Sequence, residues 1–261
     1  MIEKFSSEDL QILKSAKKSL EHPSLPARLA SMAGAPLEKG LVLLPKQAQN
    51  LIHKTAEKSI HLSYQAAHRT LKKKTHDKAD NFFHRALVVG SGAASGLFGP
   101  VALLAELPFS TSVIMRSIID IAISEGEDPA SLETQYACLE VFAFGGYSKS
   151  DDTAGSGYFM TRAALAKSLG DVAKNVGGRV LTKESAPMVA RWLSTIASRF
   201  QVVVGEKLAA QLVPVIGALG GATVNLVFMN HFQEMARGHF TVRRLERKYG
   251  YDLVRNVYNE V

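Results

Sequence analysis

The chain has 261 residues, of which 46% are hydrophobic and 21% are charged, and its formal net charge is +7. This composition is that of a globular protein with a substantial core and excludes a disordered chain. The positive charge favours acidic partners such as anionic lipid headgroups. The single cysteine, Cys138, excludes an intramolecular disulfide and a cysteine-rich zinc site, and its apolar neighbours predict a buried thiol. The N-terminus is charged and amphipathic rather than signal-like, so we expect a cytoplasmic protein.

The first 44 residues are predicted to form a short helix followed by an irregular arm. The helix covers residues 7–21, with Ser7 as its N-cap and leucines along one side. Prolines and glycines then recur up to Pro45 and break any regular pattern. We therefore interpret residues 1–44 as an N-terminal helix with a proline-rich arm, and residues 45–261 as one helical domain.

The rest of the chain shows apolar residues at three- and four-residue steps, which is typical of helices. A long helix begins at Pro45 and ends at the lysines 72–74. Further helices are predicted over residues 78–89, 101–124, 129–144, 158–169, 187–212 and 223–249. Almost no segment alternates with a period of two. The sequence therefore predicts an all-α fold, a multi-helix bundle.

Two glycine-rich stretches without charged residues interrupt this pattern, and both contain small residues four positions apart. The glycines concerned are Gly92 and Gly96 in the first stretch and Gly217 and Gly221 in the second. We expect the two breaks to pack together at the centre of the bundle, where glycines allow helices to approach closely. Nucleotide binding at the first break is an alternative, but no second strand follows it. Membrane contact is another, because each apolar stretch is close to the roughly 20 residues that span a bilayer.

Five polar residues lie inside apolar helical patterns. They are Glu106, Arg116, Asp120, Glu140 and Asn225. Buried charges are unfavourable unless they are paired, and Arg116 and Asp120 are spaced so that they can pair within one helix. The sequence therefore predicts either a buried structural network or the lining of a ligand-binding cavity.

A metal site is a further possibility on the long helix, where His53, Glu57 and His61 share one face. His231 and Glu234 form a similar pair one turn apart. The flanking lysines favour a hydrated polar face over a metal site, so we expect no metal and no cofactor. No signature of a nucleophile elbow, a phosphate-binding loop, a metalloprotease or a kinase is present.

Basic residues gather at the ends of two helical patterns. They are Lys72, Lys73 and Lys74 in the first half, and Arg243, Arg244, Arg247 and Lys248 near the C-terminus. Such runs form either a solvated helix surface or an anion-binding patch. Near an anionic membrane each such charge contributes roughly 1 kcal/mol of binding.

Several segments, in order, resemble the EcsC family of bacterial proteins, named from an operon that also encodes an ABC transporter. The segments are GSGAASGLFGP, IAISEGEDP with the helix before it, LEVFAFGG, LVPVIGALGGATVNLVFMNHF and FTVRRLERKYG. They lie between residues 45 and 251. The resemblance implies no catalytic residues, and it implies possible association with a membrane.

Three functions are compatible with these patterns. The first is a non-enzymatic cytoplasmic protein that associates peripherally with the inner membrane, through anionic lipid or a membrane protein complex. The second is a carrier of an apolar, lipid-like ligand in a cavity lined by the four glycines. The third is an enzyme built on Glu106, Asp120, Glu140 and His231. No nucleic-acid partner is expected, because no recognisable binding module is present.

Overall fold

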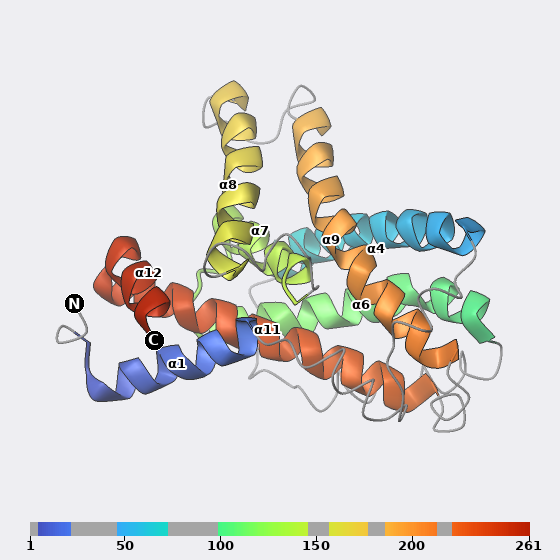
Figure 1. Cartoon of the computed structure of the whole chain (residues 1–261). Coiled ribbons are helices and arrows are strands. Elements are labelled where there is room, and N and C mark those ends of the chain that lie inside the picture. Colours follow the sequence, from blue (N-terminus) through green and yellow to red (C-terminus); the bar gives the residue numbers. More distant parts are fainter. Residues whose placement is uncertain (1–4, 22–45, 73–98, 146–156, 177–185, 213–220) are drawn as a thin grey trace.

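A computed structural model describes residues 5–21, 46–72, 99–145, 157–176, 186–212 and 221–261. Within these ranges the chain forms eight α-helices and one short 3-10 helix, and no strand (Figure 1). The predicted all-α bundle is confirmed. The elements are α1 (Ser7–Glu21), α4 (Lys46–Lys72), α6 (Gly99–Ser124), α7 (Leu132–Glu140), η2 (Val141–Ala143), α8 (Gly157–Val176), α9 (Ala186–Leu212), α11 (Gly221–Tyr249) and α12 (Tyr251–Glu260).

Helix α6 is the core helix of the bundle, because α4 and α11 both pack against it (Figure 1). Its segment Leu104–Ser124 is the one part of the described chain that is long and apolar enough to cross a membrane. However, 61% of that apolar window is buried inside the protein. Burial by surrounding helices explains why α6 is apolar on most sides.

Helix α4 has one buried apolar face and one exposed polar face. Ile52, Ala56 and Ile60 follow one another at four-residue steps and are buried against the neighbouring helices α6 and α9. Lys54 and Lys58 lie on the opposite, exposed side of the helix. The sequence pattern therefore gives both the helix and its orientation.

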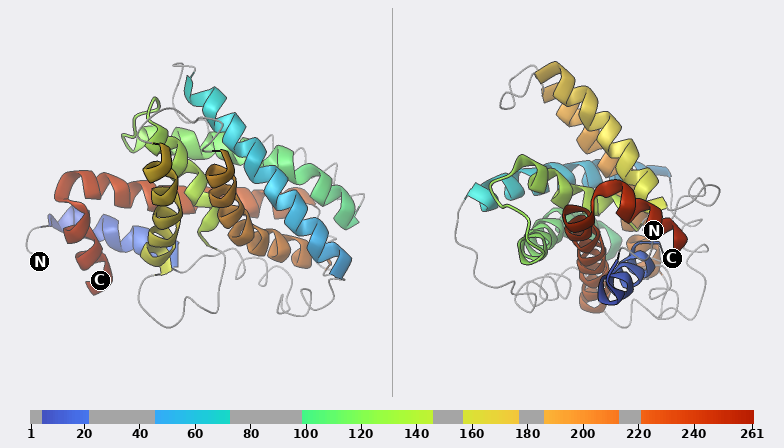
Figure 2. Two further views of the ribbon diagram at one scale, coloured as in Figure 1. Left: turned by 90° about the horizontal axis from the view of Figure 1, so that it is seen from above. Right: turned by 90° about the vertical axis from the view of Figure 1, so that its left-hand side faces the viewer.

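Helix α11 is the longest of the described helices, and α1 and α12 pack along its C-terminal half (Figure 2). Helix α1 approaches closely at Gly238, where an added Cβ atom would lie 2.8 Å from Leu20 Cγ. Polar contacts fix the other end of α1, because Lys248 Nζ and Tyr249 Oη each donate to Asp9 Oδ2 at 2.6 Å. Helix α1 is thus part of the same packed body as the main helices.

Helix α8 and the first half of α9 lie side by side and project from the remaining helices (Figure 1). The lower part of α9 turns into the bundle, where Phe200 packs against Phe142 and Phe232 at centroid distances of 5.3 and 5.7 Å. Cys138, on α7, is fully buried, as predicted. Burial raises the pKa of its thiol far above the ordinary value, so the thiol is not a nucleophile.

Several predicted boundaries were wrong by a few residues. Ser6 rather than Ser7 caps α1, because Ser6 Oγ accepts from the Asp9 amide at 3.1 Å. Helix α7 begins after Ser131, whose Oγ accepts from the Glu133 amide at 3.1 Å, and not at Pro129.

Two further differences concern glycines. Helix α8 continues through Gly170 to Val176, beyond the predicted end at residue 169. Gly250 ends α11 as predicted, but with a φ of +90° it also leads directly into α12, which the sequence did not predict. The predicted helix over 78–89, the arm, and Gly92, Gly96 and Gly217 lie outside the described residues. Gly221 is the first residue of α11.

Candidate functional site

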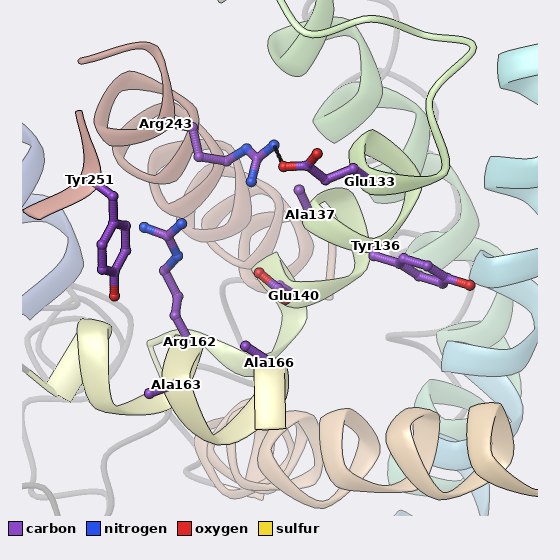
Figure 3. A pocket seen from close by; sticks show the side chains of 9 residues that line it. All are labelled: Glu133, Tyr136, Ala137, Glu140, Arg162, Ala163, Ala166, Arg243 and Tyr251. Atoms are coloured by element: carbon purple, nitrogen blue, oxygen red, sulfur yellow. Dashed lines mark hydrogen bonds and ion pairs between the residues drawn. The ribbon is translucent and has the colours of Figure 1, made fainter. Parts of the chain in front are cut away.

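A charged cleft lies where α7, α8, α11 and α12 meet. It consists of two adjoining pockets of about 280 and 410 Å³, which share Glu133, Arg243 and Tyr251. We call the smaller one the Glu140 pocket (Figure 3). Its lining residues are Glu133, Tyr136, Ala137, Glu140, Arg162, Ala163, Ala166, Arg243 and Tyr251.

The hollow exists because three alanines line it. Ala137 comes from α7, and Ala163 and Ala166 come from α8, so neither helix fills the space between them. Glu140, the last residue of α7, lies at the centre of the labelled side chains, between Arg162 and Ala166 (Figure 3). The pocket is therefore a small apolar-walled space with a carboxyl group in it.

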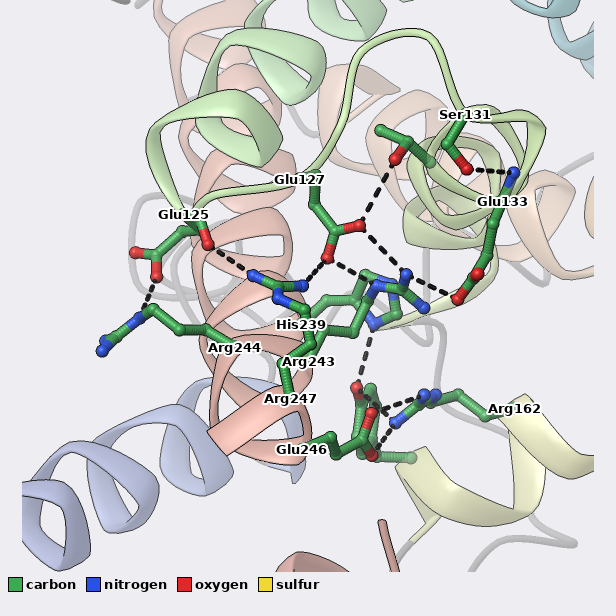
Figure 4. A network of polar contacts seen from close by, with 12 residues as sticks. Glu125, Glu127, Ser131, Glu133, Arg162, His239, Arg243, Arg244, Glu246 and Arg247 are labelled. Atoms are coloured by element: carbon green, nitrogen blue, oxygen red, sulfur yellow. Dashed lines mark hydrogen bonds and ion pairs between the residues drawn. The ribbon is translucent and has the colours of Figure 1, made fainter. Parts of the chain in front are cut away.

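Arg162 forms one charged side of the pocket. Its Nη1 and Nη2 donate to the two carboxylate oxygens of Glu246 at 2.6 and 3.0 Å, which is a bidentate pair. Nη1 also donates to Tyr158 Oη at 3.3 Å. That hydroxyl lies 2.9 Å from His239 Nδ1 (Figure 4). Burial, with the charges of Arg162 and Arg243, lowers the pKa of His239 well below its ordinary value, so the ring is neutral.

Arg243 forms the other charged side of the pocket, and its guanidinium is also held by carboxylates. Its Nε and Nη2 donate to the Glu127 carboxylate at 2.9 and 3.0 Å, and Nη2 donates to Glu133 at 3.0 Å. Arg247 also pairs with Glu127 (Figure 4). Burial alone would raise the pKa of Glu127, but the hydrogen bonds and charges of these two arginines outweigh it and lower the pKa.

Glu140 differs from the other carboxylates of the cleft. Within the part of the chain that the structure describes, it has neither a hydrogen-bond partner nor an ion-pair partner within 4.0 Å. Burial raises its pKa to about 7, against the opposing charges of Arg162 and Arg243. The group therefore takes up a proton more readily than an ordinary carboxyl, and in its ionised form it can pair with a cationic group of a bound molecule.

A second polar centre lies in the bundle, far from this cleft. Asn225 Nδ2 of α11 donates to Glu106 Oε1 of α6 at 3.2 Å, so the structure brings these two predicted residues together. Lys207 of α9 is fully buried beside them, with Nζ 3.8 Å from Glu106 Oε2 and 4.3 Å from the centroid of the Phe228 ring. Burial lowers the pKa of Lys207 to about 8. The adjacent Glu206 is also buried, and its pKa is raised to about 7.

These two centres do not form one site. Glu106 contacts Asn225, whereas Glu140 shares its pocket with Arg243, eighteen positions further along α11. At 1.5 Å per residue these levels of α11 are about 27 Å apart. The four residues proposed for an enzyme therefore do not converge.

The remaining predicted polar residues lie elsewhere. Arg116 is exposed on α6, so its placement in a buried network was wrong, and Asp120 is partly buried one turn later. His231 is buried, and Gly145 packs directly against its ring.

The C-terminal basic run forms internal ion pairs, while the side chains of Arg244, Arg247 and Lys248 remain 40–57% exposed. Arg243 and Arg247 pair with Glu127, Arg244 Nε donates to Glu125 at 2.7 Å, and Lys248 pairs with Asp9. The side chain of Lys72, and Lys73 and Lys74 altogether, lie outside what the structure describes. The basic residues that are described thus hold α11 to α1 and to the turn before α7.

No group of residues suited to a metal ion occurs among the described residues. On α4, His53 Nδ1 lies 2.8 Å from Gln201 Oε1 and Glu57 accepts from Ser194 Oγ at 3.1 Å, while His61 is exposed. The face with metal-like spacing therefore makes contacts to α9 instead.

The helices and the charged cleft together define an all-α bundle protein with a small polar pocket. The model of the EcsC protein family matches residues 7–245, and the chain belongs to this family. No curated protein and no solved structure matches the chain.

Proposed function

We propose that this protein is a non-enzymatic, cytoplasmic protein that docks peripherally on the anionic inner face of the membrane. The outer face of α4 is the docking surface, and we define that face by Leu51, Lys54, Lys58 and His61. All four side chains are exposed, and Leu51 is a 42% exposed aliphatic residue beside the lysines. A basic face with an exposed apolar residue is suited to lipid headgroups.

The charge distribution of the chain supports this choice of helix. Helix α4 contains five lysines and arginines and one carboxylate, Glu57. That carboxylate is turned toward α9, because it accepts the hydrogen bond from Ser194. The cationic side chains of α4 that the structure describes, Lys54 and Lys58, are both exposed.

The arginines of α11 and Lys248 are a poorer surface for the same purpose. Lipid phosphates would have to compete with Glu127, Glu125 and Asp9, which already hold these side chains. The observation that carries the proposal is thus the exposed pair Lys54 and Lys58, and not the longer basic run near the C-terminus.

The test is co-sedimentation with phosphatidylcholine vesicles that contain or lack phosphatidylglycerol. We expect binding only to the anionic vesicles and weaker binding when salt rises from about 0.1 M to about 0.5 M. Lys54→Gln/Lys58→Gln removes two charges from the docking face, each contributing about 1 kcal/mol, so the partition coefficient should fall about 30-fold.

A matched control exists on α1, where Lys14 and Lys18 are also exposed and also four residues apart. Lys14→Gln/Lys18→Gln makes the same change in net charge and should alter binding by less than about threefold. Equal losses in the two double variants would mean that net charge alone drives association, and the α4 surface would be abandoned. The proposal also fails if the wild-type protein does not bind to anionic vesicles.

A further inference from the structure

The Glu140 pocket contains one carboxyl group that neither of its arginines holds. Arg162 is held by Glu246, and Arg243 by Glu127 and Glu133. Glu140 is left over, with no close partner in the described part of the chain. We propose that this pocket binds a small molecule with a protonated amine, which forms an ion pair with Glu140.

The neighbouring arginines do not make the pocket an anion site. Each guanidinium already donates to carboxylates at 2.6 to 3.0 Å, so an anionic ligand would have to displace an internal partner. The two arginines also fail to satisfy Glu140, since burial outweighs their charges and raises its pKa. A cation in direct contact would supply the stabilisation that the carboxylate lacks.

The size and walls of the pocket limit the ligand. A volume of about 280 Å³ corresponds to about nine water molecules at their share of the liquid, and so to about nine non-hydrogen atoms. The alanines 137, 163 and 166 supply apolar walls, and Tyr251 stands beside Arg162 at the edge (Figure 3). The part of the ligand that fills this pocket is thus an amine on a short apolar body.

The probe is 2-phenylethylamine, added to the full-length protein and followed by NMR or calorimetric titration. Two molecules with the same phenylethyl body serve as comparisons: neutral 2-phenylethanol and anionic 3-phenylpropionate. We expect the amine to bind at least tenfold more tightly than either, because only the amine can pair with Glu140. The proposal is overturned if 3-phenylpropionate binds more tightly, or if the amine shows no binding at about 10 mM.

Two variants separate the site from general charge effects. Glu140→Gln keeps the size of the side chain but removes the charge, and should weaken binding of the amine at least tenfold. Glu260→Gln removes an exposed carboxylate on α12 and should leave binding unchanged. Ala166→Leu changes an exposed helix position that lines the pocket, so it should block binding without unfolding the protein. Unchanged binding in Glu140→Gln would overturn the proposal.

A pH titration distinguishes a Glu140 that pairs with the ligand from a Glu140 that has only a structural role. The charged groups facing Glu140 are Arg162 from α8, Arg243 and Glu246 from α11, and Glu133 from its own helix. The arginines and an alkylamine stay protonated between about pH 8.5 and 5.5, so Glu140 dominates the change in this range. Amine affinity should fall about 30-fold over that range in the wild type, and a flat profile would contradict the ion pair. Neither result depends on α4, so this test and the vesicle test fail independently.

Discussion

At the scale of single residues, glycine positions carry information that composition alone does not. Gly145 and Gly250 both adopt positive φ, at +79° and +90°, where a side chain is strained. They differ in their surroundings. A Cβ atom at Gly145 would lie 2.5 Å from His231 Nε2, whereas nothing lies within 4 Å of one at Gly250.

The pair therefore separates backbone strain from packing. We expect Gly250→Ala to lower the free energy of unfolding by about 1–2 kcal/mol through strain alone. Gly145→Ala should lower it by about 3 kcal/mol, because overpacking against the buried His231 is added. Urea unfolding of both variants measures the difference. Equal losses would show that the His231 ring moves aside at no cost.

Some of the buried polar residues could be predicted from the sequence, and others could not. Glu106 and Asn225 were identified because they interrupt apolar patterns, and the structure brings them together. Lys207 was missed, although the adjacent Glu206 and Lys207 are the only charged residues in a long apolar run, which was a usable signal. Arg162 could not be assigned, because its partner Glu246 is 84 residues away and surface arginines look the same in sequence.

At the scale of elements, the spacing of apolar residues predicted where most helices lie, but it did not predict the residues at which they begin and end. Ser131 caps α7 through its own side chain, so the helix begins where the capping bond forms and not at the nearest proline. Helix α12 was missed because Gly250 was interpreted as the end of helical structure. A glycine with positive φ ends one helix but does not prevent another from beginning.

The contact between α1 and α11 gives a prediction at this scale. Gly238→Ala should destabilise the protein by about 1–3 kcal/mol, because the new methyl group meets Leu20 Cγ at 2.8 Å. Leu20→Ala alone should cost about 2–4 kcal/mol, since Leu20 is 5% exposed.

The double variant is the informative measurement. Truncating Leu20 makes room for the methyl group, so the two losses should combine to at least about 1 kcal/mol less than their sum. Chemical unfolding of the two single variants and the double variant completes the cycle. Strict additivity would mean that Leu20 does not limit the approach of α1 to α11.

At the scale of the whole molecule, Glu127 joins parts of the chain that are distant in sequence. Its carboxylate is 5% exposed, lies just before α7, and holds two arginines of α11. Glu127→Gln should lower the free energy of unfolding at pH 7 by about 3 kcal/mol, because it removes the buried carboxylate that holds Arg247 and leaves Arg243 with only the exposed Glu133. Glu133→Gln is the matched control. Glu133 pairs with the same Arg243 but is 76% exposed, so the loss should stay below about 1 kcal/mol.

The effect of Glu127 depends on pH with a defined sign. Because its pKa is lowered in the folded protein, the unfolded chain takes up the proton first, near the ordinary value of 4.5. The stability that Glu127 contributes is fully present above that pH and is lost as the pH falls through the lowered value. The gap between wild type and Glu127→Gln should therefore shrink from pH 7 to pH 3, and a constant gap in unfolding experiments would contradict the assignment.

The all-α architecture needed only the spacing of apolar residues, as the stripe of α4 illustrates. The charged cleft needed the fold, because Glu127 and Arg243 are 116 residues apart. The same limit applies to the C-terminal basic run, whose ion pairs with Glu127, Glu125 and Asp9 could not be predicted because these partners are distant in the sequence.

The position of α1 has a consequence for synthesis on the ribosome. Lys17 of α1 donates to the carbonyl of Tyr258 at 2.8 Å, across a sequence separation of 241 residues, and α1 lies beside α12 (Figure 2). At about 5–20 residues per second, α1 is made roughly 12–50 s before the residues that bury Leu13 and Leu20 against α11 and α12. The earliest-made of the described helices therefore exposes its leucines to other nascent chains and chaperones until α11 and α12 have been synthesised.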